Sequence, residues 1–311
     1  MTADETADLL ATSIAEAAAK IESARAKINL ALHVLNRRPD GYHALDSLVV
    51  FAELADTLTA FRRDESVVEV SVDGDFADIL GETTLPEDNL VYSVACALIR
   101  AFPDRIPDGI RLNLTKELPV AAGLGGGSAD AAATLRLLNR MWRLGLGASE
   151  LIGLGASLGA DVPVCVLSRP ARIEGIGERV TPVTTLPAIP LVLVNPGVAM
   201  ETGSVFRRLR PAERPPLPPM PQRFVSLMEL VFWLRKTRND LFEPACEAAP
   251  VIETVVRMLA SDPDCMFARM SGSGATVFGI FLSIEAASRA AERLRDVRPE
   301  WWVAVTWTGG S

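Results

Sequence analysis

Apolar and polar residues alternate along residues 24–34, close to the start of the chain. A repeat of two residues is that of a β-strand, whose successive side chains point to opposite faces. The pattern therefore predicts a strand with one aliphatic face and one mostly polar face, and the polar face either lies in solvent or covers a cleft. The aliphatic face holds Ile28, Leu30, Leu32 and Val34, and the other holds Lys27, Asn29, Ala31 and His33.

Further apolar runs predict both strands and helices along the rest of the chain. Asp40-Gly41 is a strong marker for a turn at residues 36–41. Six prolines within residues 210–223 predict an irregular loop. Strands are expected at residues 45–58, 67–72, 110–114, 162–167, 191–194, 266–270, 277–282 and 301–307. Helices are expected at residues 89–101, 129–143, 148–158, 202–209, 224–236, 250–259 and 284–296.

The order of these elements predicts an α+β protein in two parts, residues 24–176 and residues 177–311, with the active site in the cleft between them. Residues 1–23 form an acidic, alanine-rich N-terminal extension, which is either an isolated amphipathic helix or disordered. The extension lacks the basic start and the apolar core of a signal peptide.

Composition and charge narrow the classes of function. The chain has 311 residues, 49 % of them apolar, and a formal net charge of −8, which argues against a nucleic-acid-binding protein. A ligand that carries phosphate stays compatible, because a site can be positive locally. The four cysteines are far apart and form no Cys-x-x-Cys pair, which is typical of reduced thiols in a cytosolic protein. No apolar run approaches the ~20 residues that span a bilayer, so we expect a cytoplasmic protein without a membrane span.

The segment at residues 119–129, here called the glycine loop, reads Pro-Val-Ala-Ala-Gly-Leu-Gly-Gly-Gly-Ser-Ala and leads into an alanine-rich helix. Glycine lacks a Cβ, so backbone N–H groups can turn towards a large anion, and the helix start adds unpaired N–H groups. Ser128 is a suitable N-cap and Asp130 suits the first turn. The loop predicts a phosphate cradle for a nucleoside triphosphate. A flexible turn or a tight helix–strand contact is the alternative.

Two familiar phosphate loops do not fit this segment. A Walker-A loop ends in Gly-Lys-Ser/Thr, and no lysine follows Gly127. A dinucleotide fingerprint would place Ser128 where a glycine or alanine belongs, and it would lack the preceding buried strand.

Lys27 and Asp161 are candidates for phosphoryl-transfer chemistry. If the polar face of the first strand covers a cleft, Lys27 could neutralise charge on the transferring phosphoryl group. Asp161 lies between a predicted helix and the apolar run at residues 162–167, where an aspartate often serves only as a turn former or cap. A kinase that acts on an alcohol, however, needs a group that orients the hydroxyl and accepts its proton, and a carboxylate beside an ammonium suits that role.

Two further segments are candidates for ligand contacts. Tyr42 and His43 follow the first turn and could stack on and hydrogen-bond a flat ring, although a surface turn has the same pattern. Gly272, Ser273 and Gly274 lie in a second glycine-rich turn between apolar strands. That turn is either a simple hairpin connection or a backbone lining for phosphate.

The glycine loop resembles that of the GHMP kinases, the small-molecule kinases related to galactokinase, homoserine kinase and mevalonate kinase. Their signature reads Pro-x-x-x-Gly-Leu-Gly-Ser/Gly-Ser/Gly-Ser-Ala, and its positions are filled by Pro119, Gly123, Leu124, Gly125, Gly126, Gly127, Ser128 and Ala129. Five further segments are similar to the family of 4-diphosphocytidyl-2-C-methyl-D-erythritol kinases. They are Ala-Lys-Ile-Asn-Leu at 26–30, Arg-x-Asp-Gly-Tyr-His at 38–43, Leu-Gly-Ala-Asp-Val-Pro at 158–163, Asn-Asp-Leu at 239–241 and Met-Ser-Gly-Ser-Gly-Ala-Thr-Val-Phe at 270–278.

The resemblance implies a two-domain GHMP-kinase fold and a reaction of the non-mevalonate isoprenoid route. In that reaction the γ-phosphoryl group of ATP passes to the 2-hydroxyl of the cytidyl diphosphate substrate. The resemblance places Lys27 and Asp161 in the catalytic positions and the glycine loop at the ATP phosphates. It also implies Mg²⁺, for which no carboxylate pair marks ligands. By the same resemblance the substrate-binding residues are Asn29, Tyr42, His43, Phe206, Gly272, Ser273 and Gly274.

Two alternatives remain at this point. Another GHMP kinase would share the loop but not Gly-Tyr-His after Ala-Lys-Ile-Asn-Leu. A binding protein that has lost transfer chemistry would not need both Lys27 and Asp161. The expected partners are ATP and a small cytidyl diphosphate substrate, without nucleic acid or membrane, and the sequence does not indicate an oligomeric state.

Overall fold

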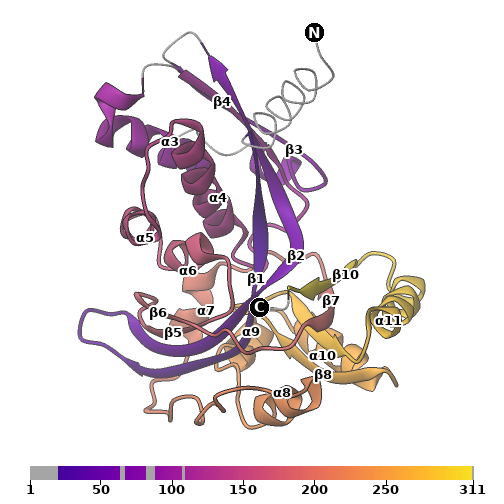
Figure 1. The fold of residues 1–311 in the computed structure, drawn as a ribbon. Coiled ribbons are helices and arrows are strands. Elements are labelled where there is room, and N and C mark those ends of the chain that lie inside the picture. Colours follow the sequence, from indigo (N-terminus) through magenta and orange to yellow (C-terminus); the bar gives the residue numbers. More distant parts are fainter. Residues whose placement is uncertain (1–19, 64–66, 82–87, 107–108, 310–311) are drawn as a thin grey trace.

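The computed structural model describes residues 20–63, 67–81, 88–106 and 109–309 as a mixed α and β protein. Within these residues ten strands form one continuous sheet, and helices pack against it (Figure 1). This arrangement confirms the predicted α+β class. The predicted N-terminal helix lies largely outside the described residues, and the first strand begins at Ile21. In the described part of the chain, no helix is long and apolar enough to cross a lipid bilayer.

The elements follow the expected order with a few additions. The strands are β1 (Ile21–Arg37), β2 (His43–Arg63), β3 (Val68–Asp73), β4 (Gly109–Thr115), β5 (Ala171–Gly175), β6 (Arg179–Pro182), β7 (Ile189–Asn195), β8 (Cys265–Met270), β9 (Val277–Phe281) and β10 (Trp302–Thr308). The helices are α2 (Asp78–Gly81), α3 (Leu90–Ala101), the 3₁₀ turn Pro103–Arg105, α4 (Gly126–Met141), α5 (Ala148–Ala156), α6 (Val162–Leu167), α7 (Thr202–Arg208), α8 (Leu227–Leu234), α9 (Phe242–Ala248), α10 (Val251–Ser261) and α11 (Ile284–Val297). The short strands β5 and β6 and helix α9 are not marked by the sequence pattern.

Strand β2 joins the two halves of the sheet. It is antiparallel to β1 along the whole hairpin and also pairs with β4 and β5, and it meets β10 at Ala52. The order of the main path is β3-β4-β2-β10-β7-β9-β8. In Figure 1 the β1–β2 hairpin runs down the length of the molecule, from the helical upper half to the lower half. The predicted division at residues 176 and 177 stays a prediction, and strand β6 just beyond it pairs back onto β5.

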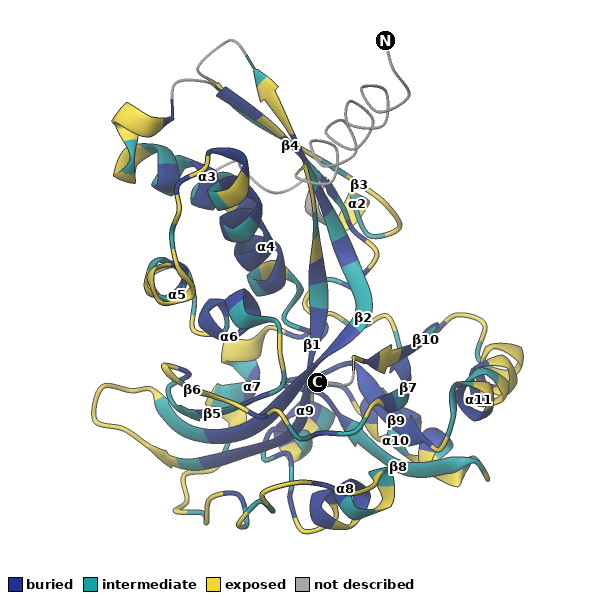
Figure 2. Ribbon diagram, in the orientation of Figure 1, coloured by how far each residue is buried: buried dark blue, intermediate teal, exposed yellow. Residues whose placement is uncertain are grey.

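Three apolar clusters fill the interior (Figure 2). The first lies between the upper part of the sheet and α3, α4, α5 and α6. The second brings Ile28 and Leu30 of β1 against α8 and β7. The third brings Leu32 and Val34 against α9, α10 and α11. Strand β1 therefore contributes to both lower clusters, and its residues 26–34 are buried.

The apolar run Val162–Leu167 is a helix, α6, and the predicted strand is wrong. A six-residue apolar run fits a buried helix as well as a buried strand. Pro163 lies in the first turn of α6, where a missing N–H costs no helical hydrogen bond. Because α6 begins at Val162, the backbone of this residue is helical. The residue before a proline usually has an extended backbone, so this expectation fails here.

A buried charge cluster holds the start of α4 against β2 and β4. Lys116 Nζ donates to Asp56 Oδ2 at 2.5 Å and to Asp130 Oδ2 at 2.9 Å, and all three side chains are almost fully buried. Asp56 Oδ1 accepts the backbone N–H groups of Glu117 and Leu118. Within the described residues Asp130 Oδ1 has no hydrogen-bond partner. The cluster therefore fixes the chain on both sides of the glycine loop.

Two carboxylates share a single ammonium in this cluster. Burial, only partly offset by Lys116, raises the pKa of Asp130 to about 7. The two carboxylates outweigh burial at Lys116 and raise the pKa of that lysine.

We predict that Asp130 makes the stability of the protein fall as pH rises from 5 to 7. Over this range the folded chain binds more protons at Asp130 than the unfolded chain, so the free energy of unfolding decreases with pH. Asp130→Asn should remove roughly 2 kcal/mol of this pH dependence. Urea denaturation at pH 5, 6, 7 and 8 measures it, with the exposed Asp104→Asn as control. Parallel pH curves for wild type and Asp130→Asn would contradict the prediction.

Candidate active site

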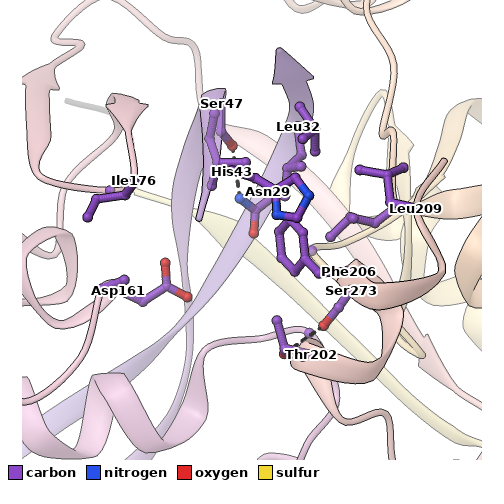
Figure 3. Close-up of a pocket in the computed structure, with 18 of the residues that line it drawn as sticks. Asn29, Leu32, His43, Ser47, Asp161, Ile176, Thr202, Phe206, Leu209 and Ser273 are labelled. Carbon is purple, nitrogen blue, oxygen red and sulfur yellow. Dashed lines mark hydrogen bonds between the residues drawn. The ribbon is translucent and has the colours of Figure 1, made fainter. Parts of the chain in front are cut away.

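A cavity of about 860 Å³ opens between the β1–β2 hairpin, the glycine loop and α7. Its size suits a small-molecule site. Figure 3 shows Asp161 projecting into it on one side, with Asn29, His43 and Phe206 gathered on the other. The predicted residues that line it are Lys27, Asn29, Tyr42, His43, Gly123, Gly125, Gly126, Gly127, Ser128, Asp161, Phe206, Gly272 and Ser273. The predicted residues Pro119, Leu124, Ala129 and Gly274 do not line it.

Lys27 and Asp161 form an ion pair on the wall of the cavity. Lys27 Nζ lies 2.9 Å from Asp161 Oδ2, and the two side chains are 5 % and 46 % exposed. Asp161 occupies the N-cap position of α6, yet its carboxylate makes no capping hydrogen bond. The carboxylate is therefore available to Lys27 and to a ligand. Helix capping, the alternative explanation for an aspartate at this position, does not account for it.

Asn29 connects Lys27 to the neighbouring strands. Its Oδ1 accepts a hydrogen bond from Lys27 Nζ at 3.3 Å, and its Nδ2 donates to Ser47 Oγ at 2.9 Å. Ser47 in turn donates to the carbonyl of Ala31. The backbone N–H of Asn29 donates to Ser271 Oγ. This chain of hydrogen bonds fixes the amide so that its oxygen faces Lys27.

The glycine loop approaches β1 closely because its residues lack side chains. Gly125 has a φ of +64° and is the N-cap of α4, and a Cβ on it would lie 3.0 Å from Lys27 Cε. The sequence suggests Ser128 as the N-cap, and this prediction is wrong. Ser128 lies in the first turn of the helix and lines the cavity. The Ala129 N–H is already bonded to the Gly125 carbonyl. Only the earlier N–H groups are left to face a ligand.

The second glycine-rich turn, residues 271–275, packs directly on the glycine loop. Ser271 Oγ donates to the Gly123 carbonyl at 2.8 Å, and a Cβ on Gly123 would lie 2.4 Å from the Ser271 carbonyl oxygen. Asn239 Nδ2 donates to the carbonyls of Met270 and Gly272. Ser273 Oγ lies 2.9 Å from Thr202 Oγ1 at the start of α7. The turn is thus a support for the loop, and Gly272 and Ser273 also line the cavity.

An aromatic pair closes the cavity near the end of the hairpin. The rings of His43 and Phe206 lie 5.1 Å apart at 30° to each other. Burial and the nearby Arg37 guanidinium lower the pKa of His43, so the imidazole is neutral at pH 7. Tyr42 is 61 % exposed beside the pair. All three residues line the same cavity, so their rings are available to a flat ligand ring.

A β-bulge changes which side chains of β1 face the cavity. The register between β1 and β2 shifts between Asn29 and Ala31, which inverts the alternation beyond that point. Leu32 and Val34 therefore line the cavity with Lys27 and Asn29. The prediction that His33 shares their face is wrong, and its ring instead bonds backbone groups of the loops outside the hairpin.

The cavity is positive although the protein is acidic. Among the lining residues that the structure describes, Asp161 alone is acidic. The basic lining residues are Lys27, Arg37, Arg207, Arg210 and Arg214. The four arginines, together with Ser47 and Thr202, belong to none of the motifs that the sequence analysis singles out.

Within the described residues there is no group of three or more His, Cys, Asp or Glu side chains able to enclose a metal ion. The cysteines are free thiols, and burial together with the nearby Asp161 carboxylate raises the pKa of Cys165 to about 12. The cavity thus presents a cation–carboxylate pair, a glycine loop and aromatic rings. Its lining residues bear an excess of positive charge, which suits ligands that carry phosphate and a ring.

Comparison with known proteins places the chain in a family. The model of the GHMP kinase N-terminal domain matches residues 89–169, and the model of the GHMP kinase C-terminal region matches residues 222–299. The 4-diphosphocytidyl-2-C-methyl-D-erythritol kinase of Chelativorans sp. (strain BNC1) is 45 % identical over 93 % of this chain and 96 % of its own. The protein of the same name from Dinoroseobacter shibae is 48 % identical over 91 % of this chain and 93 % of its own.

Solved structures agree with this assignment. A crystal structure of 4-(cytidine 5'-diphospho)-2C-methyl-D-erythritol kinase superposes with a TM-score of 0.76 at 33 % identity, covering 94 % of this chain and 100 % of the other. Homoserine kinase from Cytophaga hutchinsonii superposes with a TM-score of 0.67 at 16 % identity, covering 94 % and 95 % of the two chains, and so shares the fold. The chain belongs to the GHMP kinases and, within them, to the 4-diphosphocytidyl-2-C-methyl-D-erythritol kinase family.

Proposed function

We propose that the protein transfers the γ-phosphoryl group of ATP to the 2-hydroxyl of 4-diphosphocytidyl-2-C-methyl-D-erythritol, a step of the non-mevalonate isoprenoid route. The observation that carries the proposal is the Lys27–Asp161 pair, 2.9 Å apart beside the glycine loop in a positive cavity. The names of the relatives supply the substrate.

The pair accounts for the chemistry of transfer. The substrate hydroxyl oxygen forms a bond to the γ-phosphorus, the bond from that phosphorus to the β,γ-bridging oxygen breaks, and ADP leaves. Asp161 orients the hydroxyl and accepts its proton. Lys27 stabilises the charge that develops on the transferring group. Asn29 holds the ammonium in place from the side of β1.

The glycine loop is the proposed site for the ATP phosphates. Gly125 begins α4 with a left-handed conformation, so the N–H groups of the first turn point out of the helix end. Helix starts of this kind favour phosphate through their unpaired N–H groups and the helix dipole. The loop is held from below by Asp56, Lys116 and Asp130, and from the side by the turn at 271–275.

Mg²⁺ fits this site as an ion that arrives with ATP. Mg²⁺ in kinases is held mostly by phosphate oxygens and water, with one or two protein oxygens. The hydroxyl of Ser128, in the first turn of α4, lines the cavity at the loop and would hold the ion. When bound, the ion neutralises negative charge on the triphosphate.

The aromatic residues are the proposed site for the cytosine ring. The neutral imidazole of His43 can both donate and accept hydrogen bonds at the edge of a base. Tyr42 and Phe206 offer ring faces for stacking. Such stacking is tolerant of the base, so discrimination between bases rests on His43.

The function is tested by measuring ATP consumption with the cytidyl substrate, homoserine and mevalonate in parallel. We predict turnover with the cytidyl substrate only. Asp161→Asn and Lys27→Ala should each lower kcat by a factor on the order of 10²–10⁴, the usual effect of a general acid or base. Binding of the cytidyl substrate should change far less. Near-normal turnover by Asp161→Asn would remove the base from the mechanism.

A matched set of glycine variants tests the phosphate site. A Cβ on Gly127 would meet only Leu90 Cδ1, at 3.7 Å, so Gly127→Ala should fold and gain up to about 1 kcal/mol of helix stability. The methyl group should nevertheless obstruct phosphate and raise KM for ATP at least about tenfold. Gly125→Ala should instead lower kcat, because its Cβ displaces Lys27. Gly153→Ala is the control, a helical glycine with no atom within 4 Å of the added Cβ. Equal KM for ATP in the Gly127 and Gly153 variants would show that the loop is only a turn.

Substitution of the aromatic residues tests recognition of the base. Stacking is worth roughly 1–3 kcal/mol per base, so Tyr42→Ala should raise KM for the cytidyl substrate about 5- to 150-fold while KM for ATP stays unchanged. Phe232→Ala is a control, because Phe232 is an exposed ring outside the cavity. His43→Ala should weaken discrimination against a uridyl analogue. The site is misassigned if the enzyme phosphorylates free methylerythritol as efficiently as the cytidyl compound.

A further inference from the structure

The proline-rich loop, residues 210–223, forms part of the cavity wall and carries charge into it. The lining residues at the start of this loop include Arg210 and Arg214. Arg207 at the end of α7 and Arg37 at the end of β1 line the same cavity. None of these four arginines has a part in phosphoryl transfer or in base stacking as described above. They form a group that we call the arginine rim.

The proline-rich loop is firmly held although it contains no helix or strand. The backbone N–H of Leu217 donates to Asp46 Oδ2 at 2.8 Å. Asp46 is almost completely buried on β2 and also accepts two hydrogen bonds from Arg172, at 2.8 and 2.7 Å. A buried carboxylate with this many donors is a strong anchor, because its charge is fully compensated. Trp233 Nε1 ties the later part of the loop by donating to the Pro219 carbonyl.

Two further contacts place the loop beside the end of β1. The backbone N–H of Arg214 donates to the Leu35 carbonyl at 2.9 Å, two residues before Arg37. The Pro215 carbonyl lies 3.1 Å from His33 Nδ1 and accepts a hydrogen bond from Arg238 at 2.7 Å. His33 Nε2 accepts the backbone N–H of Arg238, so its Nδ1 carries the proton and donates. The geometry therefore brings Arg214 and Arg37 to the same end of the cavity.

Arg207 Nη2 donates to Glu201 Oε2 at 3.2 Å, whereas the charges of the other three rim arginines are only loosely compensated. Arg214 Nε lies 3.8 Å from Asp240 Oδ1, an oxygen already bonded to Arg238 at 2.7 Å. Arg210 Nη2 lies 3.9 Å from Glu247, and its side chain is 89 % exposed. Arg37 forms no ion pair with any residue that the structure describes. Its backbone lies opposite that of His43 in the register of the hairpin.

We propose that the arginine rim binds the diphosphate of the nucleotidyl substrate, with Arg37 and Arg214 as its principal contacts. This inference rests on the proposed function. The base lies at the aromatic pair and the reacting hydroxyl at Lys27 and Asp161, so the diphosphate that joins them must follow the cavity wall. Guanidinium groups suit phosphate because they donate two parallel hydrogen bonds. Arg37 lies opposite His43 in the hairpin register and lines the same cavity, so we assign to it the phosphate nearest the base.

The rim is tested by comparing ligands that differ only in phosphate. The affinities of cytidine, cytidine monophosphate and cytidine diphosphate are measured by calorimetry on wild type, Arg37→Ala and Arg214→Ala. Arg223→Ala is the matched control, since Arg223 is an exposed arginine of the same loop outside the cavity lining. We expect each rim variant to lower the ratio of diphosphate to cytidine affinity by about tenfold or more, the usual effect of a lost charged hydrogen bond. Cytidine binding itself should not change.

In turnover assays the rim variants should raise KM for the cytidyl diphosphate substrate and leave KM for ATP unchanged. The inference is overturned if both rim variants have the same ratio of cytidine diphosphate affinity to cytidine affinity as Arg223→Ala. This holds even if the enzyme is fully active. If wild type instead fails to turn over the cytidyl substrate, the proposed function fails. In that case the inference about the arginine rim holds only if Arg37→Ala and Arg214→Ala still lower the ratio of cytidine diphosphate affinity to cytidine affinity. Arg37 is exposed, so its variant tests the rim even if Arg214→Ala does not fold.

Discussion

Two buried ammonium groups flank the glycine loop, and the site depends on how each is neutralised. A Cβ on Gly125 would lie 3.0 Å from Lys27 Cε, and one on Gly126 would lie 3.4 Å from Lys116 Nζ. A charge taken out of water is tolerated only beside a partner of opposite charge. The two carboxylates around Lys116 are buried beneath the loop, whereas the partner of Lys27 lies on the cavity wall. One physical constraint thus produces both a permanent support and an accessible reactive pair.

The motifs of the sequence mark residues that the fold brings together, and the roles of these residues stay predictions. Lys27, Asp161 and most of the glycine loop meet around one cavity, as expected. The local sequence pattern gives wrong predictions where strand pairing or tertiary packing determines the conformation. The bulge after Asn29 depends on the register with β2, which no local window contains, so the assignment of His33 to the polar face is wrong. The apolar run at 162–167 is compatible with a buried helix and with a buried strand. It forms a helix that packs beside α4 and α5.

The arginines of the cavity could not be predicted for a related reason. They lie at the end of a strand, at the end of a short helix and in a loop rich in proline, where neither periodicity nor motif indicates direction. The loop takes its path from Asp46, which is far away in the sequence. A net charge of −8 likewise says nothing about the field inside one cavity. Low-dielectric walls concentrate the effect of nearby charges, so a positive pocket in an acidic protein can still attract anions.

The continuity of β2 restricts how this enzyme can move. The strand is bonded to β4 in the upper half of the molecule, to β5 lower down and to β10 at Ala52. A wide hinge opening between the halves would have to break this ladder or bend a strand that is packed on both faces. Access for ligands therefore depends on side chains and on short connections at the cavity mouth, while the frame stays rigid. The strand that carries Lys27 and the glycine loop are also joined directly, by the hydrogen bond from the Lys27 N–H to the Leu124 carbonyl at 2.8 Å.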